Sequence, residues 1–104
     1  MGIGSTSHIC FLIDFNGSTK YKDYLGQHIA YQEGGISFGN ILYNSINAQL
    51  GITPSRRDDM TSLGYMLLMF LRGYLPWHGL KANTQYQRKA FVLERKCCDY
   101  CKLL

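Results

Sequence analysis

The stretch DMTSLGYMLLMFLR, residues 59–72, constrains the fold more than any other part of the sequence. Its apolar side chains are Met60, Leu63, Tyr65, Met66, Leu67, Leu68, Met69, Phe70 and Leu71. At the helical period they cover one side and most of the other, and a helix that is apolar nearly all round is usually buried on all sides. The sequence therefore predicts a central helix whose entry is suited by Pro54 and Ser55, with Asp58 and Asp59 in its first turn. The helix is regular from Asp59, ended by Gly73 and followed by Pro76.

A chain of 104 residues offers few neighbours for such a helix. Without them, we expect it to leave a larger apolar patch than monomers usually expose. Residues 43–50 predict a short helix, and a final helix is expected from about 83 to 96, where Thr84 and Gln87 fit a capping box. The expected apolar stripe of that final helix consists of Tyr86, Ala90 and Leu93.

The N-terminal part follows a different pattern. Residues 8–15 predict a strand, in which the apolar run Phe11-Leu12-Ile13 leads directly into Asp14. Residues 16–40 are polar and rich in glycine, with no sustained period of 2 or 3.6 residues. A loop of this length in a compact domain is functional or disordered.

The net charge of +4 is mild, and the C-terminal part is its more basic section. A solvated helix face explains this excess better than nucleic-acid binding, because no aromatic-interleaved basic motif is present. There is no basic start followed by a long apolar stretch, as in a signal peptide, and the longest apolar run, residues 63–71, is too short to span a bilayer. We therefore expect no membrane and a cytoplasmic location, with the nucleus as an alternative.

The four cysteines are Cys10, Cys97, Cys98 and Cys101. The last three contain one C-x-x-C, whereas a structural zinc site usually has four ligands. Nothing in the sequence places Cys10 or a histidine beside them, so reduced, free thiols are favoured over a metal site.

Residues 45–82, SINAQLGITPSRRDDMTSLGYMLLMFLRGYLPWHGLKA, resemble the casein kinase I family of serine/threonine protein kinases, and its alpha branch in particular. The resemblance lies in S-I-N, L-G-I, S-R-R-D-D, S-L-G-Y and L-P-W-x-G-L-K-A. QHIAYQE, residues 27–33, is similar to the family's activation segment, and MGIG and FLIDF are similar to the strand pair before it.

The resemblance covers about residues 1–90 and implies a partial kinase C-terminal lobe. The expected fold is mainly α with a short β hairpin at its start. Residues 91–104 are expected to form a divergent basic, Cys-rich tail.

The same resemblance assigns roles to two aspartates. Asp14 stands at the metal-binding aspartate of Asp-Phe-Gly, although Asn16 replaces the glycine. Asp59, in one motif with Gly64, stands where a kinase holds the backbone of its catalytic loop. The alternative for this pair of carboxylates is helix capping, for which Asp58 is the better candidate.

A substrate anion site is implied for Lys81 and Arg88. Leu42 stands where the family has an arginine of this anion site. Because leucine offers no charge to phosphate, the anion site would be only half complete. Asn40 replaces the threonine that contacts the catalytic aspartate.

The family's activity is ATP- and Mg-dependent phosphorylation of serine or threonine in acidic or phosphate-primed proteins. This sequence contains no Gly-rich phosphate loop, strand lysine or catalytic-loop aspartate, which in the family precede the matching region. We therefore expect a chain that is non-catalytic alone and does not bind ATP and Mg by itself.

Two alternatives stay open. One is a kinase-derived interaction module that docks its central helix onto a full-length kinase or another protein. The other is a partial gene model of an active casein kinase I, whose partners would be protein substrates. Neither reading involves nucleic acid.

Overall fold

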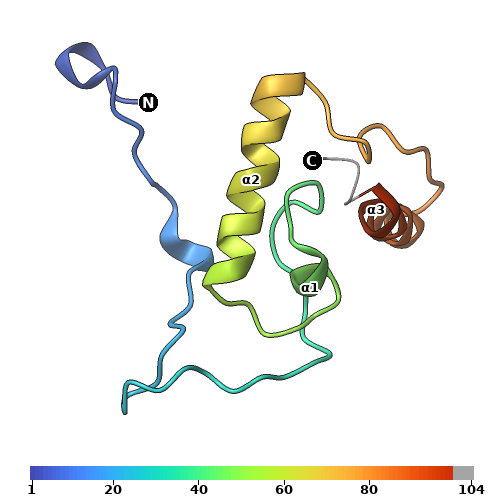
Figure 1. Cartoon of the computed structure of the whole chain (residues 1–104), viewed down its shortest axis with the longest axis horizontal. Helices are drawn as coiled ribbons and strands as arrows, with labels where there is room; N and C mark the ends of the chain where they lie inside the picture. The colour runs from blue at the N-terminus through green and yellow to red at the C-terminus, as the bar shows by residue number, and fades with distance from the viewer. Residues whose placement is uncertain (100–104) are drawn as a thin grey trace.

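The computed structural model describes residues 1–99 and is mainly α-helical (Figure 1). Its helices are α1 (Ile46–Gln49), α2 (Arg56–Arg72) and α3 (Gln85–Asp99), and two 3-10 turns lie at Gly4–Thr6 and Phe15–Gly17. In Figure 1, α2 stands in the middle, α1 and α3 lie to its right, and the N-terminal residues descend on its left.

The long helix α2 has its N-cap at the predicted entry residue, Ser55, and ends where predicted. Ser55 is its N-cap residue, and Asp58 and Asp59 in the first turn complement the helix dipole. Gly73 ends the helix with a φ of 76°, a conformation that glycine adopts without steric cost, and its N–H donates to the carbonyl of Met69 at 2.8 Å.

The two other predicted helices are also present. The predicted cap of α3 is confirmed in a shifted form: Thr84 Oγ1 accepts from the Gln87 N–H at 3.1 Å, and Gln87 Oε1 accepts from the Asn83 N–H at 3.2 Å. The predicted apolar stripe of α3 is wrong, since Tyr86 is 83% exposed. The buried residues are Val92, Lys96 and Asp99 instead, at helical spacing.

The core is small and lies between α2, α3 and the loop that joins them. It consists of Tyr65, Leu75, Trp77 and Val92. The rings of Tyr65 and Trp77 meet edge to face, with centroids 4.9 Å apart, and Trp77 Nε1 donates to the carbonyl of Leu42 at 2.7 Å. Trp77 therefore joins α2, α3 and the segment before α1.

Helix α2 is covered on one side only, although its sequence is typical of a helix that is buried on all sides. Met60, Phe70 and Leu71 are 65%, 73% and 83% exposed. The part of the chain described by the structure places its other helices against one side of α2 (Figure 1). The expected exposure of apolar side chains on this helix agrees with these values.

The predicted β hairpin is also wrong. Residues 1–99 contain no strand, and their one β-bridge is an isolated antiparallel pair, Lys22 with His28. Residues 10–13 make no backbone hydrogen bond within the described chain. A strand requires a ladder to a partner, and the preceding residues curl into a 3-10 turn instead of pairing with this apolar run.

We call residues 1–31 the N-terminal arm, and none of its residues is buried. The arm expands the molecule: the radius of gyration over Cα atoms is 15.9 Å, against about 13 Å for a compact domain of this length. None of the helices described is both long and apolar enough to cross a bilayer.

Candidate functional site

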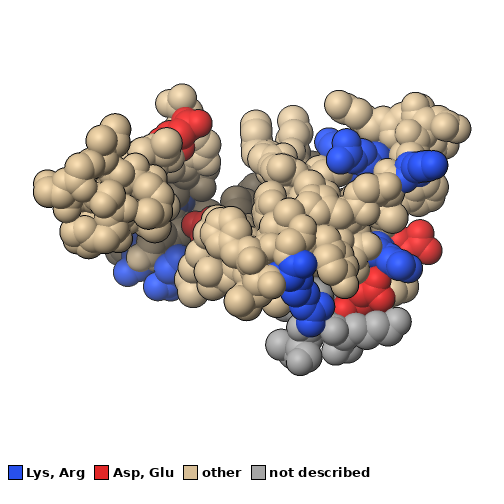
Figure 2. Space-filling model, turned by 90° about the horizontal axis from the view of Figure 1, so that it is seen from above, with Lys and Arg blue, Asp and Glu red and all other residues tan. Residues whose placement is uncertain are grey.

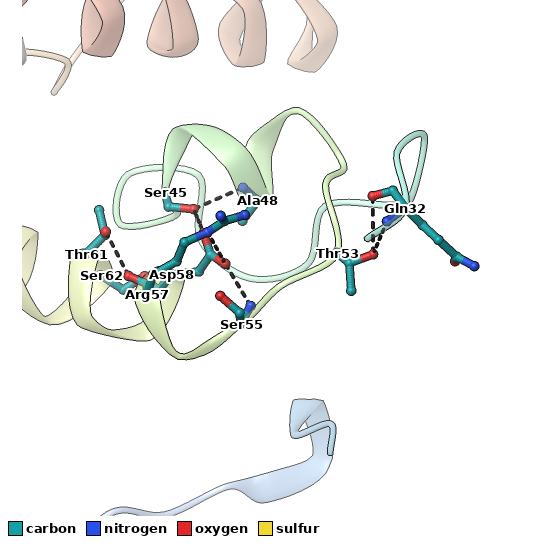
Figure 3. Close-up of polar contacts among 9 residues, drawn as sticks. All are labelled: Gln32, Ser45, Ala48, Thr53, Ser55, Arg57, Asp58, Thr61 and Ser62. Carbon is teal, nitrogen blue, oxygen red and sulfur yellow. Dashed lines mark hydrogen bonds and ion pairs between the residues drawn. The ribbon is translucent and has the colours of Figure 1, made fainter. Parts of the chain in front are cut away.

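A buried carboxylate joins the starts of α1 and α2 (Figure 3). Asp58 is 5% exposed, and its Oδ1 accepts a hydrogen bond of 2.5 Å from Ser45 Oγ. Its Oδ2 accepts from the backbone N–H of Ser55 at 2.8 Å, which satisfies a donor at the helix entry. Hydrogen bonds to a carboxylate are stronger than neutral ones, so this contact is a firm connection between the two helices.

Ser45 has a double role in this connection. Its hydroxyl oxygen accepts from the N–H of Ala48 at 3.0 Å, which caps α1, while its O–H donates to Asp58. Arg57 Nε lies 3.6 Å from Asp58 Oδ2, but the arginine side chain is 55% exposed, so this ion pair contributes little. The expectation that Asp58 is the capping carboxylate is confirmed.

An open hollow of about 490 Å³ lies between the arm, α1 and the first turns of α2. Its lining residues are Gly17, Ser18, Thr19, Tyr21, Ile36, Ser37, Phe38, Asn44, Ala48, Ile52, Pro54, Ser55, Arg56, Asp58, Asp59 and Ser62. Seen from above in Figure 2, a recess separates the arm on the left from the helices. On this face, lysine and arginine side chains occur at several separate places and do not form one basic patch.

Asp59 lies in the wall of this hollow and is exposed. An exposed carboxylate beside several hydroxyl and amide groups can accept hydrogen bonds from the N–H groups of a peptide segment. The arm closes one side of the hollow, where the Arg56 guanidinium lies 4.5 Å from the centre of the Tyr21 ring. The wall of the hollow can therefore accept hydrogen bonds from a bound peptide segment.

The segment after the arm returns to the helices through backbone contacts (Figure 3). The N–H of Gln32 donates to Thr53 Oγ1 at 3.0 Å, and the N–H of Thr53 donates to the carbonyl of Gln32 at 2.9 Å. The N–H of Gly35 donates to the carbonyl of Gly51 at 2.9 Å. A Cβ on Gly51 would lie 2.3 Å from the Gly35 carbonyl oxygen, so this close approach requires a glycine.

Asp14 lies in the N-terminal arm. It is exposed and has a φ of 62°, a left-handed conformation that aspartate tolerates better than most residues. Within residues 1–99, no group of three or more His, Cys, Asp or Glu residues could hold a metal ion. At the position where the resemblance implies Mg-ATP, Asp14 is therefore an exposed carboxylate outside any such group.

Lys81 and Arg88 are both exposed, and neither side chain makes a hydrogen bond or an ion pair in the described chain. Gly64 is half-buried in α2, and a Cβ there would meet nothing within 4 Å. The close packing that a helix glycine often permits is therefore not used at this position.

The cysteines described by the structure, Cys10, Cys97 and Cys98, are exposed and free. The expected C-x-x-C also includes Cys101, which lies outside the described residues.

Lys96 is the important residue that sequence reasoning missed. It is fully buried, and its Nζ donates to the carbonyls of Ile41 and Asn44, both at 2.6 Å. Burial lowers its pKa from 10.5 to about 8. The spacing of Val92 and Lys96, one helical turn apart, is a signal for it, but lysine is almost never fully buried, so the pattern favours a solvated face.

A comparison with models of known protein families finds none that matches this sequence.

Proposed function

We propose that residues 1–90 are a casein-kinase-I-like part of a kinase C-terminal lobe, and that the chain acts as a protein-binding module, not as a phosphotransferase by itself. The exposed apolar face of α2 carries this proposal. This face consists of Met60, Leu63, Met66, Leu67, Phe70 and Leu71, which are 37–83% exposed. The supporting resemblance is that of residues 45–82, whose helices α1 and α2 are joined through Asp58.

An uncovered apolar face favours association. Burying one large apolar side chain contributes roughly 1.5–3 kcal/mol, and contiguous apolar patches often mark interaction sites. The face contains no charged side chain between Asp59 and Arg72, so a partner can cover it without burying an unpaired charge. The partner we propose is a protein with an apolar surface, with a full-length casein kinase I as the first candidate.

Phosphoryl transfer depends on positioned charges around the nucleotide phosphates. Asp14 is an exposed carboxylate on the arm, and Asn16 replaces the glycine that eases backbone rotation there. The function that we propose for this chain therefore includes no catalytic step.

The binding proposal is tested with purified casein kinase I on a calorimeter or biosensor. The wild-type chain should bind, and a variant with Leu67→Ser and Phe70→Ser should lose at least about tenfold in affinity, equal to 1.4 kcal/mol. The matched control is Tyr86→Ser, an aromatic position on α3 that is even more exposed than Phe70, which should bind like the wild type. Equal affinity of all three chains, or no binding by any, contradicts this choice of face and partner.

The non-catalytic part of the proposal has its own test. The purified chain should phosphorylate casein no faster than an Asp14→Ala variant, and Mg-ATP should leave its melting temperature unchanged. Phosphorylation above that control would overturn it.

A second candidate function is protein kinase activity in a longer chain, and the position of Asp59 favours it. This carboxylate is exposed in the wall of the hollow, where an added catalytic loop could donate backbone N–H groups to it. In that case the chain is part of a longer, active kinase. Sequencing the transcript upstream of Met1 decides between the two: an upstream reading frame with a Gly-rich loop and a strand lysine supports the enzyme.

A further inference from the structure

The side chain of Lys96 ends among three oxygen acceptors and two aromatic rings. Its Nζ donates to the carbonyls of Ile41 and Asn44 at 2.6 Å each, and to Gln49 Oε1 at 3.4 Å. A protonated amine has three N–H donors, and three oxygen acceptors face them here. All three acceptors are uncharged, so an ordinary salt bridge does not explain the burial.

Two aromatic rings complete the surroundings. Nζ lies 5.4 Å from the centre of the Tyr65 ring and 5.4 Å from that of Trp77. A cation within about 6 Å of an aromatic face is attracted by the ring, and more strongly where water is excluded. Lys96 and Trp77 are both fully buried, so water is excluded at this site.

The site and the lysine come from separate parts of the chain. The acceptors belong to the segment 41–44 and to α1, the rings to α2 and the loop after it, and the lysine to α3. Lysine usually extends its amine into water along an apolar stem, and here it does the opposite. With a pKa of about 8, the amine still carries its proton at pH 7.

We propose that the oxygens of Ile41, Asn44 and Gln49, with the rings of Tyr65 and Trp77, form a binding site for a primary alkylammonium group. We call it the amine cradle. In the wild-type chain the Lys96 amine occupies the amine cradle, and this side chain thereby fixes α3 to the rest of the fold. When that side chain is removed, the cradle accepts a small primary alkylammonium ion in its place. This inference does not rest on the kinase resemblance or on the binding face of α2.

The first test uses the wild-type chain. Reductive methylation followed by mass spectrometry compares Lys96 with the exposed lysines Lys20, Lys22, Lys81 and Lys89. Lys96 should react about tenfold or more slowly, because the reagent reaches it only when α3 opens. Modification of Lys96 at the rate of the exposed lysines would overturn the proposal.

The second test is chemical rescue. Lys96→Ala retains Cβ, and n-propylammonium replaces the missing three carbons and the amine. Propylammonium chloride should raise the melting temperature of this variant more than tetramethylammonium chloride at equal concentration, because only the primary ion can donate three hydrogen bonds. The matched control is Lys89→Ala, at an exposed lysine of the same helix, which should respond equally to both salts.

Equal responses of the Lys96→Ala chain to both salts would refute the cradle. Where this variant does not fold, propylammonium should restore its near-ultraviolet circular dichroism, and failure to do so counts against the proposal. The methylation rates test the burial of the amine independently, because they need no variant.

Discussion

The N-terminal arm and the helical part of the chain, residues 32–99, differ in how much their residues contact other segments of the chain. In the helical part, Trp77, Asp58 and Lys96 each join segments that are distant in the sequence. In the arm, residues 10–13 form no backbone hydrogen bond, and no residue is buried. The comparison shows that an apolar run becomes a structural element only where another segment pairs with it or covers it.

The largest expected difference between the two regions concerns their aromatic side chains. Trp77→Ala should destabilise the fold by about 3–5 kcal/mol, because it removes a fully buried ring and its hydrogen bond to Leu42. Phe15→Ala in the arm, where the ring is 66% exposed, should change stability by less than about 0.5 kcal/mol. Urea unfolding followed by circular dichroism measures both, and similar losses would show that the arm is packed after all.

The second prediction concerns pH. The pKa of Lys96 is about 8 in the folded chain and 10.5 when solvated, so between these values the unfolded chain binds more protons. Stability should therefore rise with pH from about 8 to 10.5, by up to about 3 kcal/mol, and this group should add no pH dependence below about 7.

The measurement is the free energy of unfolding of the wild type minus that of Lys96→Met, taken at each pH. The difference cancels the titration of tyrosines and thiols that both chains share. A difference that stays constant, or falls, between pH 8 and 10.5 would contradict the burial of the amine.

The third prediction compares the adjacent carboxylates of α2. Asp58→Ala leaves the Ser45 hydroxyl and the Ser55 N–H without their acceptor and should cost about 1–3 kcal/mol. Asp59→Ala should change stability by less than about 0.5 kcal/mol, because that side chain is exposed. If thermal melts rank the two variants in the opposite order, Asp59 has a partner that the structure does not contain.

The smallest effect is expected at Gly64. Since a Cβ there meets nothing within 4 Å, Gly64→Ala should stabilise the chain by about 1 kcal/mol through the higher helix propensity of alanine. The variant also sharpens the binding proposal. If Gly64→Ala raises the melting temperature but weakens binding to casein kinase I, the partner packs closely against α2 at this residue.

Much of the helical part could be predicted from the sequence. Local chemistry specifies the end of α2 at Gly73, the Thr84 and Gln87 cap, and the capping contact of Asp58 with the Ser55 N–H, because each depends on neighbours within about four residues. The strand predicted at residues 8–15 is absent for the opposite reason. Its apolar pattern is genuine, but a ladder needs a second strand, and no local signal shows whether one is available.

The candidate site shows the same division. The resemblance marks Asp14, Asp59, Lys81 and Arg88 as candidate site residues. The structure leaves all four side chains exposed. It brings Asp59 to a hollow and, within residues 1–99, leaves Asp14 outside any group of three or more possible metal ligands. The residue with the most unusual environment, Lys96, is one that sequence reasoning places in solvent, because charged side chains are nearly always there.

The sequence by itself determined the helices, their caps and the apolar surface of α2, because helix propensity, capping and hydrophobic periodicity act over one or two helical turns. Only the tertiary structure decided that α2 is covered on one side and that residues 8–15 form no strand. It alone also decided that Lys96 enters the amine cradle, where the carbonyls of Asn44 and Ile41 lie 52 and 55 residues away in the sequence. Burial and hydrogen bonding between distant segments depend on which surfaces meet, and an amine can lose its water only where acceptors and aromatic rings from several segments converge on it.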